Sequence, residues 1–113
     1  MSEHLQITRL PIAYDPDLGA ESRALVAGLT QDTGQLIAGA AGSSPYLRRL
    51  IEQEAPWIGD ALTAPKQALA AVFDDCRALA PDQLKPGLRQ AKRRVALLTA
   101  LCDLSGGWSL EEV

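Results

Sequence analysis

Apolar residues recur at three- and four-residue intervals through most of this chain, and this spacing is the feature that most constrains its fold. From Glu21 onward the pattern is that of amphipathic helices, which place positions i, i+3, i+4 and i+7 on one face. β-branched residues are scattered, and no run of four residues alternates cleanly as a half-buried strand would. The sequence therefore predicts an all-α protein, a small bundle of about four helices with a loosely structured N-terminal arm.

The first two helical stretches are separated by the turn Gly42–Pro45. Three glycines interrupt the stretch before it, each costing roughly 0.5–1 kcal/mol relative to alanine, so it is either one weak helix or two short ones. The next helix starts cleanly, because Ser44 can cap free backbone donors and proline suits the first helical position. We expect Pro56 to end this helix and residues 59–63 to form a connector.

Two further helices are predicted at about residues 64–80 and 87–104, separated by Pro81 and Pro86. Both carry apolar stripes at helical spacing, and Cys76 and Cys102 lie within these stripes as small hydrophobic residues. We expect these two helices to supply the following core residues: Leu69, Val72, Phe73, Cys76, Leu88, Val95, Leu98 and Leu101.

The organisation along the chain has three parts. Residues 1–20 lack a clear period and form the arm, 21–104 form the helical domain, and 105–113 begin a further helix. Ser109 with Glu112 three residues later is a capping box, which announces a helix although the sequence stops soon afterwards. We therefore expect the natural polypeptide to continue beyond Val113.

Composition fits a single globular domain. The chain has 113 residues, 47% of them hydrophobic and 22% charged, with a net charge of −3. It contains no apolar run of the length that spans a membrane, and its start has no signal peptide pattern. We expect a cytoplasmic protein with no membrane partner and, given the acidic total, no nucleic acid partner.

Catalytic and metal-binding constellations are not evident. His4 is the single histidine, so neither a nucleophile–histidine pair nor a zinc site is predicted. The neighbours Asp74 and Asp75 point about 100° apart on a helix and do not converge. Residues 39–45 are glycine-rich and lead into a helix, but they follow no strand and read as a turn with a helix cap. No catalytic, cofactor-binding or metal-binding residue is assigned.

The most unusual charge feature is a basic run with no acidic residue from Gln83 to Cys102. Arg89, Lys92 and Arg93 share one helical face, whereas Arg94 turns toward another. One interpretation is a solvated face that pairs with the acidic surface of the helix at residues 64–80. The other is a docking strip for an acidic partner protein, a phosphate-bearing ligand or a neighbouring domain.

The same region resembles a known family. Leu88–Arg94 (LRQAKRR), Leu97–Leu104 (LLTALCDL), Gly106–Val113 (GGWSLEEV) and, upstream, Ser44–Leu47 (SPYL) are similar to segments of the glutamine synthetase adenylyltransferases. These enzymes attach AMP to glutamine synthetase and remove it again. The resemblance covers Ser44–Val113 and implies the N-terminal helical segment of such an enzyme, a lead-in to a nucleotidyltransferase domain that these residues do not contain.

The resemblance also implies partners and a role in nitrogen regulation. Glutamine synthetase, a PII-type signalling protein and the remaining domains of the parent chain are the expected partners, and ATP and Mg²⁺ are implied for the full-length enzyme. The segment lacks the family's catalytic Gly-Ser and acidic motif and is expected to be non-catalytic by itself. Arg89, Lys92, Arg93 and Trp108 are the candidate docking residues, with Trp108 at the boundary to the next domain. The alternative is a stand-alone helical protein-interaction module with a basic docking helix.

Overall fold

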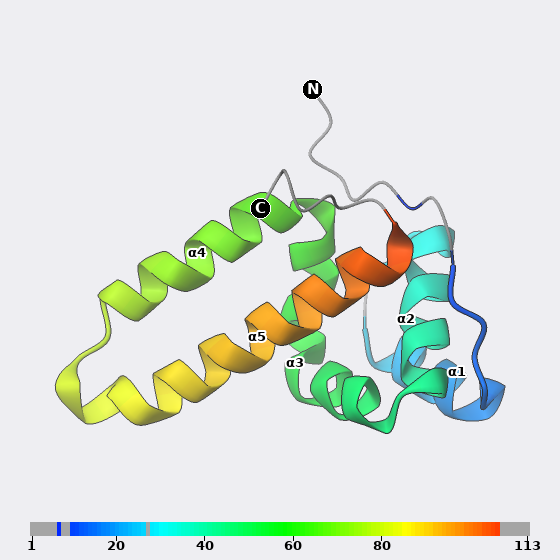
Figure 1. Cartoon of the computed structure of the whole chain (residues 1–113), viewed down its shortest axis with the longest axis horizontal. Helices are drawn as coiled ribbons and strands as arrows, with labels where there is room; N and C mark the ends of the chain where they lie inside the picture. The colour runs from blue at the N-terminus through cyan, green and yellow to red at the C-terminus, as the bar shows by residue number, and fades with distance from the viewer. Residues whose placement is uncertain (1–6, 8–9, 27, 107–113) are drawn as a thin grey trace.

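The computed structural model describes residues 7, 10–26 and 28–106 and confirms an all-α fold (Figure 1). Within these residues there are no strands. The elements in chain order are α1 (Pro16–Leu25), α2 (Gln31–Ser43), α3 (Pro45–Thr63), α4 (Pro65–Arg77), the 3₁₀ turn η1 (Pro81–Gln83) and α5 (Leu84–Ser105).

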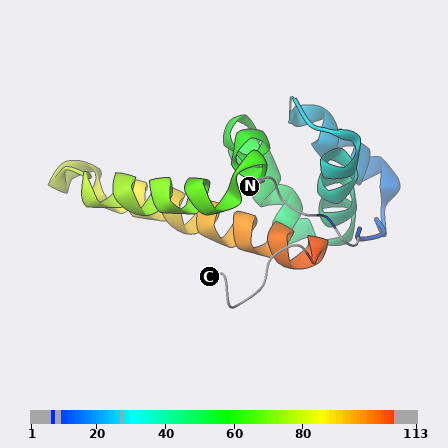
Figure 2. The same ribbon diagram turned by 90° about the horizontal axis from the view of Figure 1, so that it is seen from above.

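The helices form a packed body with a projecting hairpin. α1 and α2 lie together at one end, and α3 runs between them and the antiparallel pair α4 and α5 (Figures 1 and 2). The C-terminal half of α5 returns to the body, where α5 contacts α2 and α3 as well as α4. The far end of the α4–α5 hairpin extends away from α1 and α2, which gives the molecule extents of 42 × 32 × 23 Å.

The stretch before Gly42 forms two helices rather than one. The chain turns at Gly28, whose φ is 74°, and the Thr30 side chain caps α2 by accepting a hydrogen bond from Thr33 N–H. α1 begins at Pro16, earlier than the predicted Glu21, because Asp15 caps it and the proline occupies its first turn. This is the same signal that correctly located the start of α3 at Ser44 and Pro45.

The glycines of α2 allow the chain before α1 to approach closely. The Asp15 N–H donates to the Gly42 carbonyl at 2.8 Å, and the Ser43 hydroxyl donates to the Ile12 carbonyl at 2.7 Å. A Cβ atom at Gly39 would collide with the carbonyl oxygen of Pro11. The absence of a side chain there is therefore a packing requirement, which offsets the helix-propensity cost of glycine.

The prediction that Pro56 ends the second predicted helix is wrong. α3 continues to Thr63, so residues 59–63 are helical rather than a connector. The helix accommodates the proline through a kink at Glu54, where φ is −112° and ψ is 20°. Past the kink, Ile58 and Leu62 are buried, and this burial holds the second half of α3 against the core.

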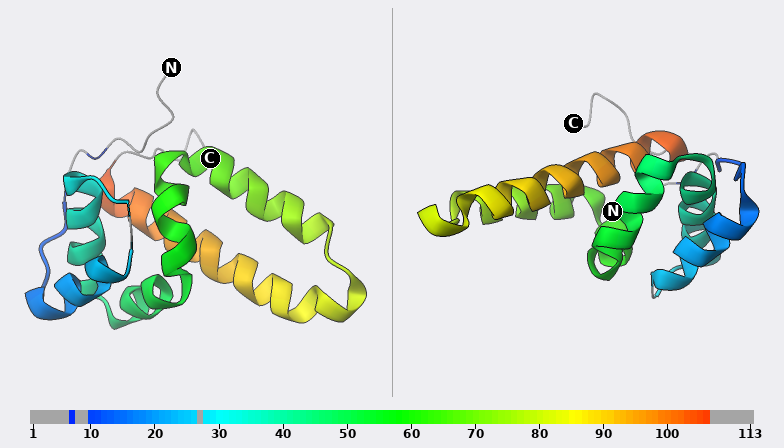
Figure 3. Two further views of the ribbon diagram at one scale, coloured as in Figure 1. Left: turned by 180° about the vertical axis from the view of Figure 1, so that it is seen from behind. Right: turned by 90° about the horizontal axis from the view of Figure 1, so that it is seen from below.

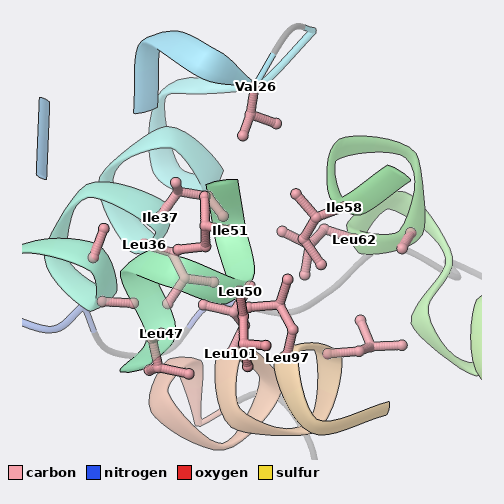
Figure 4. Close-up of a cluster of buried hydrophobic side chains, with 14 of the residues drawn as sticks. Val26, Leu36, Ile37, Leu47, Leu50, Ile51, Ile58, Leu62, Leu97 and Leu101 are labelled. Atoms are coloured by element: carbon pink, nitrogen blue, oxygen red, sulfur yellow. The ribbon is translucent and has the colours of Figure 1, made fainter. Parts of the chain in front are cut away.

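The core lies where α2, α3 and α5 meet (Figure 4). Its largest fully buried apolar side chains are Leu36, Ile37, Ile51, Ile58, Leu97, Leu98 and Leu101, together with Cys102. No helix among the described residues has the length and apolar character needed to cross a membrane.

The predicted core is correct in part. Val72, Leu98 and Leu101 are buried, and three further members of the predicted set are half-buried: Leu69, Cys76 and Val95. The prediction is wrong for Phe73 and Leu88, whose side chains are 50% and 47% exposed. Both belong to the α4–α5 hairpin, whose outer half extends beyond the other described helices and has no third layer over it (Figure 3).

We predict that Gly39→Ala destabilises the protein by about 1.5 kcal/mol, although alanine is the better helix former by up to about 1 kcal/mol. The added methyl group would push against the backbone of Pro11 and separate it from α2. Urea denaturation measures the change in the free energy of unfolding. Gln35→Ala, at an exposed position of α2, is the control and is expected to stay within about 0.5 kcal/mol. A stabilised Gly39→Ala variant would contradict this packing account.

Candidate functional site

A buried carboxylate lies at the kink of α3. Glu54 is only 3% exposed and shares the face of α3 that carries Leu47, Leu50, Ile51 and Ile58. The apolar spacing of this helix therefore draws an acidic side chain into the core. Such a charge is costly to bury unless it is paired and hydrogen-bonded.

Two arginines of α5 satisfy this carboxylate. Arg93 Nε donates to Glu54 Oε2 at 3.2 Å, and Arg94 Nε donates to Glu54 Oε1 at 2.7 Å. Consecutive helical residues point about 100° apart, so the two side chains reach the carboxylate from different sides. The Arg94 guanidinium also lies 4.9 Å from the ring centroid of Trp57, one turn beyond the kink. The cluster of Glu54, Arg93, Arg94 and Trp57 joins the kink of α3 to the middle of α5.

This cluster changes the interpretation of the basic run. Part of it is structural, since Arg93 and Arg94 hold a carboxylate on α3 rather than lying free on the surface. The pairing with the acidic surface of α4, which one of the two interpretations allowed, is absent among the described residues, where Asp74 instead pairs with Arg77 of its own helix at 3.1 Å.

Together with Arg93 of the Glu54 cluster, Arg89 and Lys92 of the basic run line an open groove between α3 and α5. Its lining residues are Tyr46, Arg49, Leu50 and Gln53 from α3 and Arg89, Lys92, Arg93 and Ala96 from α5. The structure thus brings together three of the four candidate docking residues, namely Arg89, Lys92 and Arg93. The fourth, Trp108, lies outside the described residues, as does the capping box at Ser109 and Glu112.

Sequence reasoning missed the α3 side of this groove. Arg49 and Tyr46 are about 40 residues from the α5 cations, and no local spacing pattern connects them. A signal for Glu54 was present, because its place on an apolar helical face predicts burial and therefore a cationic partner.

Neither cysteine is placed to act as a nucleophile. Cys102 is fully buried, and burial, together with the neighbouring Asp103, raises the pKa of its thiol to about 12. Cys76 lines a small hollow between α4 and α5 with Val72, Leu79 and Gly87. No histidine lies within the described residues to activate either thiol.

A metal centre is not formed by the residues that the structure describes. No three histidine, cysteine, aspartate or glutamate side chains within residues 7, 10–26 and 28–106 gather so that they could hold an ion. These residues therefore do not fit the Mg²⁺ that the family resemblance implies for full-length enzymes.

Comparison with known proteins finds several bifunctional glutamine synthetase adenylyltransferase/adenylyl-removing enzymes. The enzyme of Rhodopseudomonas palustris is 32% identical over 91% of this chain. Those of Bradyrhizobium diazoefficiens and Bradyrhizobium sp. are 37% and 34% identical over 83% and 88% of the chain. The chain spans only 10–12% of the length of these relatives. No family model and no solved structure matches it.

We predict that Glu54→Gln destabilises the protein by about 3 kcal/mol, because it leaves two guanidinium groups facing an uncharged amide. Denaturation in guanidinium chloride measures the loss in the free energy of unfolding. Glu52→Gln is the matched control on the same helix, since Glu52 forms an exposed pair with Arg48 at 3.7 Å and is expected to cost no more than about 0.5 kcal/mol. If both variants lose the same free energy of unfolding, the buried ion pairs of Glu54 contribute no more to stability than the exposed pair of Glu52.

Proposed function

This chain belongs to the family of bifunctional glutamine synthetase adenylyltransferase/adenylyl-removing enzymes, and we propose that it is the N-terminal helical segment of such an enzyme. In this proposal the parent enzyme attaches adenylyl groups to glutamine synthetase and removes them, in the regulation of nitrogen metabolism. The segment takes no direct part in the chemistry and serves as a helical scaffold for interactions.

One observation carries the proposal. The similarity to the R. palustris relative extends over 91% of this chain but only 12% of that enzyme. A match that covers most of this chain but a small part of the relative supports a role as one structural unit of a much larger protein. ATP and Mg²⁺, which the proposed parent would use, are assigned to parts of the enzyme outside this segment, together with the catalytic carboxylates.

The environment of the acidic side chains supports the non-catalytic role. Metal-assisted transfer of a nucleotidyl group requires carboxylates that converge on a reacting phosphorus atom. Glu54 is instead neutralised by two arginines, and Glu52 and Asp74 pair with cations of their own helices. We propose that these groups stabilise the segment and that glutamine synthetase, a PII-type signalling protein or another domain of the cytoplasmic parent is what it contacts.

A stand-alone helical interaction module is the second candidate function. The observation in its favour is the set of cations that line the groove without pairing with Glu54. Among the described residues, no carboxylate forms an ion pair with Arg49, Arg89 or Lys92. Unpaired cations on neighbouring helices support docking of a partner, whether or not an enzyme is attached.

A chimera tests the first function. We predict that the R. palustris enzyme, with its matching segment replaced by this chain, retains both activities that its name describes to within about tenfold, since only non-catalytic contacts change. Steady-state rates of adenylyl transfer to glutamine synthetase and of adenylyl removal are the measurements.

The control is a chimera in which an unrelated helical bundle of similar length replaces the segment; this control is expected to lose activity. If the first chimera folds, as judged by circular dichroism, but has neither activity, the proposed equivalence is wrong. If both chimeras are fully active, the segment has no role in the enzyme and the stand-alone module becomes the better account.

A further inference from the structure

The groove between α3 and α5 is lined by two matching helical faces. α3 contributes positions 46, 49, 50 and 53, and α5 contributes positions 89, 92, 93 and 96. Both sets follow the i, i+3, i+4, i+7 spacing of a single helical face, so each side runs for about 10 Å along its helix. The groove is therefore an elongated surface rather than a point site.

Every charged residue that lines the groove is a cation. These residues are Arg49, Arg89, Lys92 and Arg93, in a protein whose net charge is −3. Of these four groove cations, only Arg93 pairs with a carboxylate among the described residues, and it shares that carboxylate, Glu54, with Arg94. The Glu54 cluster thus retains one net positive charge beside three cations without carboxylate partners. The electrostatic complement of this surface is acidic.

The floor and rim of the groove indicate the kind of anion. Leu50 and Ala96 supply an apolar floor, and Tyr46, which is 59% exposed, lines the same surface. Sites for a single phosphate group place backbone N–H donors or converging guanidinium groups around one point. Here the cations are spread along two helices, and exposed tyrosine and arginine side chains are typical anchors of protein interfaces.

We propose that this groove binds an acidic, amphipathic segment of a partner protein. Carboxylates of the partner would pair with Arg49, Arg89 and Lys92, and an apolar side chain between them would cover Leu50 and Ala96. This inference deepens the interaction role in the proposed function and rests on that function for the identity of the parent. Its physical basis is the charge and shape of the groove alone.

The test uses the 113-residue chain and one probe, a fluorescein-labelled peptide of the sequence Glu-Glu-Leu-Leu-Glu-Glu-Leu-Leu-Glu-Glu, whose spacing would place glutamates and leucines on opposite faces of a helix formed on binding. We predict saturable binding by fluorescence anisotropy at low salt, weakened at least about tenfold by the double substitution Arg89→Ala/Lys92→Ala. Arg49→Ala, on the other helix, should weaken binding about threefold or more. The loss of peptide affinity that each substitution causes should become smaller as added salt screens the ion pairs.

A charge-matched double variant, Lys85→Ala/Arg77→Ala, is the control. Both residues are exposed cations outside the groove, and their loss changes the net charge by the same amount. Circular dichroism checks that all variants remain folded. Near-unchanged binding by this control supports the groove, whereas an equal loss overturns it in favour of non-specific attraction to a basic helix.

Three other outcomes would also overturn the proposal. The first is no peptide binding at low salt. The second is displacement of the peptide by inorganic phosphate at concentrations comparable to that of the peptide, which would indicate a small-anion site. The third is self-association of the chain that the Arg89→Ala/Lys92→Ala variant abolishes, which would make a second copy the occupant. An active chimera together with any of these results would leave the proposed function standing and reject only the groove.

Discussion

The carboxylate of Glu54 is buried at the kink of α3, and a charge in that position is tolerated only while cations neutralise it. The rest of the arrangement depends on this requirement. Arg93 and Arg94 must face α3, which fixes the rotation of α5 about its axis and places the stripe of Leu97, Leu98 and Leu101 in the core (Figure 4). A polar contact near the middle of the bundle and the apolar packing on either side of it thus require the same orientation of α5.

The same contact divides the basic run of α5 into cations that pair with Glu54 and cations that do not. Arg93 and Arg94 are used to satisfy Glu54, whereas Arg89, one turn before Arg93, and Lys92, the residue immediately before it, remain exposed and line the groove with Arg49 of α3. Because the cluster also holds α3 against α5, it keeps the two sides of the groove together. If the groove binds a partner as proposed, structural and interaction roles lie next to each other on one helix, and a substitution of Arg93 affects both.

Local signals predicted most of the fold. The Ser44–Pro45 start and the absence of alternating segments act over a few residues, and the structure confirms both within the residues that it describes. The apolar stripe of the last helix is confirmed at its C-terminal end, where Leu98 and Cys102 are buried, but not at Leu88. The predictions that proved wrong failed because of interactions between residues far apart in the sequence. Pro56 does not end α3, because burial of Ile58 and Leu62 stabilises the helix beyond its kink, and Phe73 is exposed because no described element covers that part of the hairpin. Only the α5 side of the groove could be identified from the sequence, as a basic strip, because tertiary packing alone brings Arg49 to the same groove as Arg89.

A double-mutant cycle between Glu54→Gln and Arg94→Gln tests the central claim most directly. Urea denaturation of the two single variants, the double variant and the unmodified chain gives the coupling energy between the two side chains. The buried pair predicts a coupling of about 1.5 kcal/mol, and the same cycle with Arg89→Gln in place of Arg94→Gln predicts a value within about 0.3 kcal/mol of zero. Equal coupling in the two cycles, or none in the first, would contradict the division of the basic helix into structural and free cations.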